Sequence, residues 1–178
     1  EATLTADAGA DTSKLFVGLT GGRNAGTHTL DAYSNQQGYD FNATTGTLTI
    51  NKASLTISST NAAKTYDGTT DVSGVNAVVS GGTQLFSTDS ISGGTFAFAD
   101  KNAGTGKHVT VSGVTVNDGN NGGNYDVTYV DNTSSTINKR LLTISAVADS
   151  KEYDGFNSST GKPVLVGRQR GDSIAGLT

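Results

Sequence analysis

The sequence contains no cysteine, methionine or tryptophan, and it has a single proline, Pro163. Without cysteine the chain can form neither a disulfide nor a thiolate metal site, so its stability must come from packing and hydrogen bonds. The absence of cysteine and methionine also removes the two most readily oxidised side chains, which fits an extracellular setting. Hydrophobic residues make up 34% of the 178 residues and aromatic residues 7%, a composition that predicts thin cores.

Strong charge of either sign is also absent. The net charge is −4 and comes mainly from aspartate, because Glu1 and Glu152 are the only glutamates. The absence of a basic cluster argues against nucleic acid or an anionic membrane as a partner. No apolar run approaches the ~18–20 residues that span a bilayer, so we expect no membrane span. The chain opens on Glu1-Ala2-Thr3 without a signal-peptide pattern, as an internal fragment or a processed product would.

What the sequence does contain is a repeat with a period of 87 residues. Tyr-Asp-Gly stands at 66–68 and again at 153–155, and Lys52–Ile57 and Lys139–Ile144 precede the two copies at the same offset. A fixed period of this length indicates tandem small domains. The alignment predicts the C-terminal part of a first repeat at 1–51, a complete repeat at 52–138, and the N-terminal part of a third repeat at 139–178.

Every readable element predicts a β-strand. Hydrophobic residues alternate with small or polar ones, as at Leu55 and Ile57, which marks strands with one buried face. Val109 and Val111 are expected to pair with Val114 and Val116 across Ser112-Gly113. The turn signals Gly81-Gly82, Gly93-Gly94 and Asp118-Gly119 are expected to separate the strands. No helix longer than a turn is expected. We therefore predict an all-β fold in which each repeat is an antiparallel β-sandwich of immunoglobulin-like architecture.

The junctions between repeats are short. The positions expected to be buried are Leu48 and Ile50 before the first junction, Leu55 and Ile57 after it, Ile137 before the second, and Leu142 and Ile144 after it. The parity of the buried positions changes across each junction, so each strand enters the next repeat with its opposite face inward. Because the linkers contain no glycine or proline, we expect the repeats to stack into a stiff rod.

Four segments carry a family resemblance, namely Lys64–Thr70, Asp100–Lys107, Gly123–Tyr125 and Ile137–Lys139. With these segments in this order, the chain resembles the Tyr-Asp-Gly (YDG) repeats and the related immunoglobulin-like MBG repeats. Both occur in large two-partner-secretion adhesins of Gram-negative bacteria that are similar to filamentous haemagglutinin. The third copy departs from the pattern, because Phe156 stands where the second copy has the first of two threonines.

The resemblance implies a secreted protein of the bacterial cell surface, whose repeats form a non-catalytic stalk or arm in adhesion and biofilm formation. It implies no particular ligand, and the expected partners are neighbouring repeats of the same chain. A second hypothesis is a self-associating fibre subunit, in which the half-repeats at the two ends complete one another head to tail. The alternative explanation of the half-repeats is a segment cut without regard to domain edges.

A third hypothesis is direct binding of cell-surface or matrix glycans. Exposed aromatic rings are the usual platforms for sugars, and the candidates here are Tyr33, Tyr39, Tyr125 and Tyr129. Nothing in the pattern singles out one of these faces.

The Tyr-Asp-Gly motif predicts a structural strand end rather than a reactive site. We expect Tyr66 to pack on the sandwich, Asp67 to cap the backbone amides that follow, and Gly68 to adopt a positive φ. Tyr153, Asp154 and Gly155 should do the same in the next copy. Lys64 and Lys151 stand two residues before each motif, where they could form an isopeptide crosslink or simply be solvated.

One loop is rich in oxygen ligands and is a candidate calcium site. Its residues are Asp118, Asn120, Asn121, Asn124 and Asp126. Ca²⁺ prefers carboxylate and carbonyl oxygens, but the loop lacks the spacing and the closing glutamate of an EF-hand. A hairpin loop with left-handed asparagine and glycine residues is the alternative. No other cofactor is expected.

The sequence does not predict an enzyme. His28 and His108 are the only histidines, and they occupy equivalent strands of different repeats, so they are not expected to share a catalytic or metal site. No serine lies in a Gly-x-Ser-x-Gly elbow.

Overall fold

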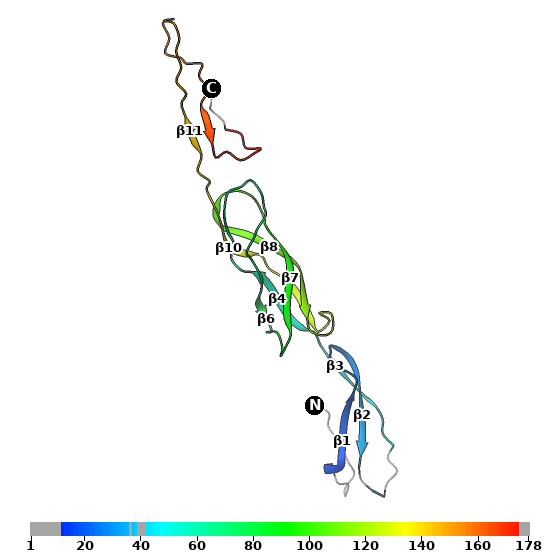
Figure 1. Ribbon diagram of the computed structural model, residues 1–178. Coiled ribbons are helices and arrows are strands. Elements are labelled where there is room, and N and C mark those ends of the chain that lie inside the picture. Colours follow the sequence, from blue (N-terminus) through cyan, green and yellow to red (C-terminus); the bar gives the residue numbers. More distant parts are fainter. Residues whose placement is uncertain (1–11, 36, 39–41, 175–178) are drawn as a thin grey trace. The chain divides into compact units, whose positions relative to one another are not determined.

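The computed structural model describes residues 12–35, 37–38 and 42–174, and this part of the chain is all-β, with no α-helix (Figure 1). The all-β prediction is therefore confirmed for the described residues. After a short 3-10 helix, Thr12–Lys14, the strands are β1 Leu15–Thr20, β2 Gly26–Ser34, β3 Gly46–Ile50, β4 Ala53–Ser59, β5 Ala63–Thr65, β6 Ala77–Gly82, β7 Ser90–Phe98, β8 Gly104–Asn117, β9 Tyr125–Tyr129, β10 Asn132–Asn138, β11 Thr143–Ser145 and β12 Val164–Val166.

The chain divides into two compact units. One comprises Glu1–Thr56, Gly81–Ser92 and Thr115–Thr128, and the other comprises Ile57–Ser80, Gly93–Val114 and Tyr129–Thr178. The predicted second repeat, 52–138, contributes residues to both units. The sandwich packing, the repeat boundaries and the rod stay predictions.

The first three strands form an antiparallel sheet in the order β1-β2-β3. Leu15 pairs with Ser34 and Gly26 with Ile50, so β2 is the central strand. The prediction that Leu48 is buried is wrong, because its side chain is 38% exposed. Leu48 lies in the edge strand β3, and a three-stranded sheet with few covering side chains leaves such positions in contact with solvent.

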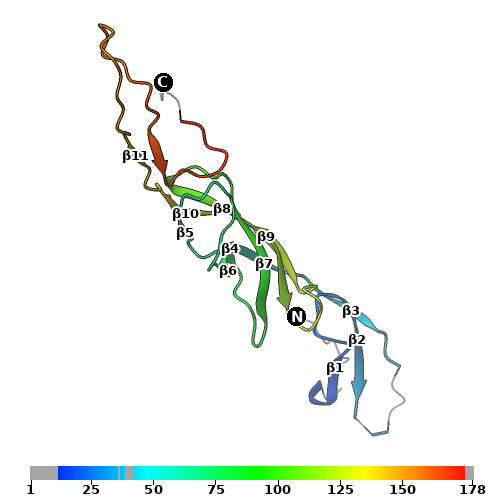
Figure 2. The same cartoon turned by 45° about the horizontal axis from the view of Figure 1, so that its top comes forward.

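Two further sheets are built mainly from the predicted second repeat. One has the order β6-β4-β9 and the other the order β5-β10-β8-β7 (Figures 1 and 2). The expectation of purely antiparallel pairing is wrong at one place, because β5 pairs with β10 in parallel, with Thr136 opposite Ala63. A parallel pair requires a long crossover connection, and the strands between β5 and β10 provide it.

The core follows the alternating positions of these sheets. Leu55 and Ile57 of β4 are fully buried, and Ile137 of β10 is 1% exposed, so all three predictions are confirmed. Ile137 packs in one buried cluster with Ala62, Phe98 and Val109. Thr56, between Leu55 and Ile57, lies on the other face of β4, as the period of two requires.

Strand β8 corrects one sequence expectation. The pairing predicted across Ser112-Gly113 is wrong, because both residues lie inside one continuous strand. The turn predicted at Gly93-Gly94 is wrong for the same reason, since both glycines lie inside β7. The buried valines of β8 change from odd to even positions across Ser112-Gly113: Val109 and Val111 precede it, Val114 and Val116 follow it. Gly113 has a φ of 64°, and this left-handed residue shifts the phase of the strand by one position without reversing it.

The last two strands form a small antiparallel pair, in which Thr143 of β11 lies opposite Val166 of β12. The prediction that Leu142 and Ile144 are buried is wrong, because they are 39% and 51% exposed. A two-stranded pair has no second layer to cover its apolar face, so these side chains stay in contact with solvent.

Candidate functional site

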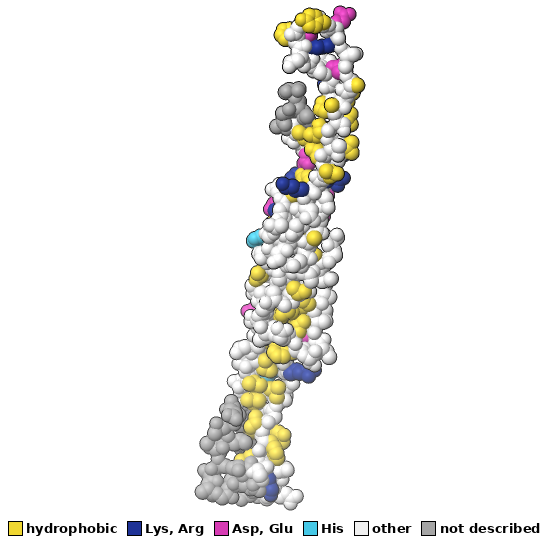
Figure 3. Space-filling model, turned by 90° about the vertical axis from the view of Figure 1, so that its left-hand side faces the viewer, with side chains coloured by type: hydrophobic (Ala, Val, Ile, Leu, Met, Phe, Trp, Pro, Cys, Tyr) yellow, Lys and Arg dark blue, Asp and Glu magenta, His cyan; other side chains and the backbone are white. Residues whose placement is uncertain are grey.

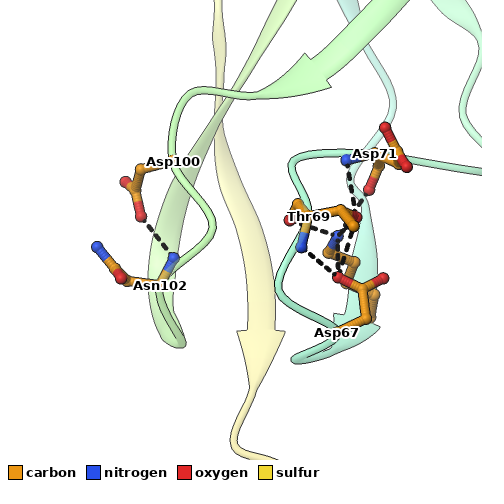
Figure 4. Close-up of polar contacts among 6 residues, drawn as sticks. Asp67, Thr69, Asp71, Asp100 and Asn102 are labelled. Atoms are coloured by element: carbon orange, nitrogen blue, oxygen red, sulfur yellow. Dashed lines mark hydrogen bonds and ion pairs between the residues drawn. The ribbon is translucent and has the colours of Figure 1, made fainter. Parts of the chain in front are cut away.

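The side chain of Lys64 organises the first Tyr-Asp-Gly turn, of which Figure 4 shows Asp67, Thr69 and Asp71. Its Nζ donates to Oδ1 of Asp67 at 2.8 Å and to the carbonyl oxygens of Thr69 and Asp71, both at 2.9 Å. The side chain is only 16% exposed, and Nζ lies 5.4 Å from the centroid of the Phe98 ring. The lysine therefore connects the turn to the core. Its ammonium group is occupied by oxygen acceptors rather than by an asparagine amide.

Asp67 and Gly68 shape the backbone of the same turn. Oδ1 of Asp67 accepts hydrogen bonds from the amide and the hydroxyl of Thr69, both at 3.0 Å, and Gly68 has a φ of 81°. The hydrogen bond from Lys64 and then the amide of Thr69 lower the pKa of Asp67 to about 2. The carboxylate is thus held in its charged form as the acceptor of the turn.

The second Tyr-Asp-Gly turn repeats this arrangement. The Nζ of Lys151 donates to Oδ1 of Asp154 at 2.9 Å and to the carbonyl oxygen of Phe156 at 2.8 Å. The amide of Phe156 donates to Oδ1 of Asp154 at 3.0 Å, and Gly155 has a φ of 80°. The hydrogen bond from Lys151 lowers the pKa of Asp154. The turn forms without the threonine hydroxyl of the first copy, because the contacts that it shares with that copy use only the backbone of Phe156.

The two tyrosines of the motif differ. Tyr66 packs partly buried against the core cluster, and its hydroxyl donates to Oδ1 of Asp172 at 2.8 Å. This hydrogen bond raises the pKa of Tyr66. The prediction that Tyr153 packs in the same way is wrong, because this tyrosine is 99% exposed and the two-stranded β11–β12 pair offers no second layer to cover it.

A second aspartate turn lies between β7 and β8. Asp100 accepts a hydrogen bond from the amide of Asn102 at 2.8 Å (Figure 4). It also accepts one from Nζ of Lys107 at 2.5 Å. The lysine contact, followed by the amide, lowers the pKa of Asp100. Here again a lysine and a backbone amide share one carboxylate at a chain reversal.

The asparagine-rich loop is closed by Asp118. Its Oδ1 accepts hydrogen bonds from the amides of Asn120 and Gly122, both at 2.8 Å, and its Oδ2 accepts one from the amide of Asn124 at 3.0 Å. Burial raises the pKa of Asp118, but these amides outweigh it, and the net pKa is lowered. Asn121 adopts a left-handed φ of 53°, which fits the loop reading of the sequence.

Asn124 ties this loop to an earlier segment of the chain. Its Oδ1 accepts a hydrogen bond from the amide of Ala25 at 2.8 Å, and its Nδ2 donates to Oδ1 of Asn24 at 3.2 Å. Its backbone oxygen accepts a hydrogen bond from the amide of Ala53 at 2.9 Å. Asp126 is exposed in β9, next to the buried Tyr125, so the two side chains lie on opposite faces of the strand.

The calcium candidates are therefore brought together only in part. The oxygens of Asp118 and Asn124 serve protein donors. Within the residues that the structure describes, no group of three or more His, Cys, Asp or Glu side chains could hold a metal ion. A calcium requirement stays an untested hypothesis.

The two histidines have different surroundings. Nε2 of His28 lies 2.6 Å from the carbonyl oxygen of Asn24, and Nδ1 of His108 lies 3.6 Å from a carboxylate oxygen of Asp131. The partner of His28 is thus a backbone carbonyl, and that of His108 is a carboxylate.

The tyrosines proposed as glycan platforms differ in their exposure to solvent. Tyr125 is 3% exposed and cannot present a ring face, which removes it from that set. Tyr33 is 53% exposed and stacks on Phe16, with ring centroids 5.3 Å apart. Tyr129 is 39% exposed, and its hydroxyl contacts the backbone of Val114. Tyr39 lies outside the described residues.

The sequence analysis missed two aspartates that bind tyrosine hydroxyls. Oδ2 of Asp89 accepts a hydrogen bond from Tyr125 at 2.7 Å, and the Tyr125 hydroxyl in turn accepts the amide of Phe86 at 2.9 Å. Burial, followed by the contact with Asp89, raises the pKa of Tyr125. The second aspartate is Asp172. Both residues begin an Asp-Ser-Ile triplet, which is the signal that could have found them.

The surface carries few charges. On the face drawn in Figure 3, lysine and arginine side chains lie in small separate groups. No helix in the described part of the chain is long and apolar enough to cross a membrane.

Comparison with known proteins identifies one family. No curated protein and no solved structure shows a significant match. Residues 49–134, which include the first Tyr-Asp-Gly turn and the asparagine-rich loop, match the YDG domain.

Proposed function

We propose that this chain is a run of tandem immunoglobulin-like YDG repeats that serves as a non-catalytic stalk or arm of a secreted bacterial surface adhesin. The observation that carries the proposal is the recurrence of one turn at a spacing of 87 residues. Lys64 and Asp67 recur as Lys151 and Asp154, and in both copies the lysine donates to the aspartate and to the carbonyl oxygen two residues after it. In this role the repeats set the reach of a binding region and support adhesion and biofilm formation.

The chemistry of the motif supports a structural role. The polar side-chain atoms of Lys64, Asp67 and Tyr66 form hydrogen bonds with partners within the chain. A binding or catalytic site needs polar groups that converge on an empty space, and these groups converge on one another. The YDG match at 49–134 agrees with this reading.

A second candidate function is self-association into a fibre. It is favoured by the exposed apolar residues of the β11–β12 pair, of which Leu142, Ile144 and Val166 are 39%, 51% and 62% exposed. A neighbouring molecule that supplied the rest of a repeat would cover them. Head-to-tail completion of the half-repeats is the geometry that this function requires.

Retention on immobilised ligands tests the stalk role against direct binding. The labelled 178-residue chain is passed over a glycan array and over immobilised matrix proteins, with an unrelated β-sandwich as control. A stalk segment gives no saturable retention. Saturable retention that disappears in Tyr33→Ala, with the fold intact, would replace the stalk by a glycan-binding module.

A display experiment tests the reach that a stalk should supply. The chain is placed between a bacterial surface anchor and an unrelated binding domain, either once or as two copies in series. Adhesion to a ligand beneath a polymer layer should increase with the second copy. If adhesion is the same with no, one and two copies, the chain does not act as a spacer.

A further inference from the structure

Asp89 and Asp172 occupy corresponding positions in the sequence and in the backbone. The triplet Asp89-Ser90-Ile91 recurs as Asp172-Ser173-Ile174. The amide of Asp89 donates to the carbonyl oxygen of Phe86 at 2.9 Å, and the amide of Asp172 donates to that of Gln169 at 3.2 Å. Each aspartate is therefore the last residue of a four-residue β-turn, Phe86–Asp89 in one case and Gln169–Asp172 in the other.

The strands that lead into these turns also correspond. Gly82, with a φ of 80°, lies so close to the backbone of Ser54 that an added Cβ would be 2.5 Å from its carbonyl oxygen. Gly167, with a φ of 98°, lies in the same way over Leu141, at 2.3 Å. Ser54 and Leu141 are 87 residues apart, the two glycines 85 and the two aspartates 83, so the third copy is shorter by two residues before its glycine and by two more before its aspartate. The contact with Ser54 or Leu141 matches the two glycines as one position of the repeat.

Each aspartate lines an open hollow, and the two hollows share their composition. Asp89 lies in a hollow with Arg23, Asn24 and Ala25. Asp172 lies in a hollow with a second basic-Asn-Ala segment, Lys101–Ala103. In both cases the Asn-Ala pair comes from one predicted repeat and the aspartate from the next. The hollows thus correspond to two successive junctions.

The two aspartates bind tyrosines from different repeats, one from the same predicted repeat as the aspartate and one from the preceding repeat. Asp89 uses Oδ2 for Tyr125, a tyrosine of its own predicted repeat. Asp172 uses Oδ1 for Tyr66, the Tyr-Asp-Gly tyrosine of the preceding predicted repeat. A carboxylate has enough acceptor sites to take both hydroxyls at once.

We infer that the Tyr-Asp-Gly tyrosine docks its repeat onto the next one, by donating to an aspartate that also holds a tyrosine of that next repeat. The partner that fits the Asp89 surface is accordingly the phenol of a preceding Tyr-Asp-Gly motif. This inference rests on the tandem arrangement in the proposed function, and it assigns to the motif the contact between repeats.

Hydrogen exchange of the intact 178-residue chain tests the docking contact. Tyr66→Phe keeps the ring in the core and removes the hydroxyl, while Tyr153→Phe makes the same change at the exposed equivalent position. Loss of a hydrogen bond to a charged acceptor should speed exchange of the Val164–Val166 and Asp172 amides by about tenfold in Tyr66→Phe. The same amides should exchange at the wild-type rate in Tyr153→Phe.

A double-mutant cycle separates docking from a general loss of stability. Asp172→Ala should accelerate the same amides, and the Tyr66→Phe, Asp172→Ala double variant should add little more. Asp89→Ala should instead perturb the amide of Phe86 and leave Val164–Val166 unchanged. If Tyr66→Phe matches Tyr153→Phe, or if the two changes at Tyr66 and Asp172 are additive, the docking role is refuted. Retention on a glycan would refute the stalk and leave this result standing.

Discussion

The Nζ of Lys64 lies 2.8 Å from Oδ1 of Asp67, and this ion pair is the centre of the first Tyr-Asp-Gly turn. Lys151 and Asp154 hold the same relationship at 2.9 Å. The first pair is the more enclosed, since the Lys64 side chain is 16% exposed and that of Lys151 is 38% exposed. The same motif therefore stands in two environments within one chain, and each copy serves as a control for the other.

Replacing Lys64 by methionine should destabilise the second repeat. Lys64→Met keeps the aliphatic stem against Phe98 but removes the donor to three backbone or carboxylate oxygens, which should cost about 1–3 kcal/mol in the free energy of unfolding. Urea denaturation followed by circular dichroism measures it. Lys151→Met is the matched control and should change stability less, because that lysine is more exposed. Equal losses in the two variants would contradict the structural role of Lys64.

The stability of the fold should fall in acid through Asp67. The pKa of Asp67 is about 2 in the folded chain, against an ordinary value of 3.8, so folding stabilises the charged carboxylate relative to the protonated acid. The contribution is complete above pH 3.8 and is lost as the pH falls through about 2. Asp67→Asn should flatten the fall in stability over this range. Carbon-detected titration of the Asp67 carboxyl checks the assignment directly.

The buried position Ile57 and its repeat equivalent Ile144 should respond differently to truncation. Ile57 is fully buried and Ile144 is 51% exposed. Ile57→Ala should cost about 2–5 kcal/mol of unfolding free energy, because it leaves a cavity in a packed core. Ile144→Ala should cost roughly 0.5 kcal/mol or less. Comparable losses, measured by chemical denaturation, would mean that the β11–β12 pair is covered in solution.

Calcium should leave the melting temperature of the chain unchanged. The carboxylate oxygens of Asp118 already accept hydrogen bonds from three backbone amides, so a cation would compete with these amides for them. Differential scanning calorimetry with millimolar Ca²⁺ and with EDTA makes the comparison. Asp118→Ala should lower the melting temperature equally in both buffers. A rise with Ca²⁺ that Asp118→Ala abolishes would establish the loop as a calcium site.

The local patterns of the sequence predict the strands well and burial less well. Alternation identifies Leu55, Ile57 and Ile137 correctly, since each lies in a sheet with a covered face. The same alternation fails at Ile144, because burial depends on a second layer that a local pattern cannot encode. At Gly113 the pattern detects a change of phase, but a bulge and a turn both produce one.

The candidate site divides in the same way. The contacts of Asp67 are with residues 64 and 69, so the motif and its spacing point to them. The contact of Tyr66 with Asp172 joins residues 106 positions apart. Nothing near Tyr66 in the sequence indicates that partner. It becomes recognisable through the second Asp-Ser-Ile triplet, once Asp89 is seen to bind a tyrosine as well.

The most direct test of the central claim, a stalk of stacked repeats, is the mass and size of the chain in solution. Light scattering and small-angle X-ray scattering are measured together over a hundredfold range of concentration. A stalk segment gives a constant mass of 18.1 kDa. Its radius of gyration is well above the value of about 16 Å that a compact chain of this length has. A radius near 16 Å would contradict the stacking of repeats, and a mass that grows with concentration would replace the stalk by a self-associating fibre subunit.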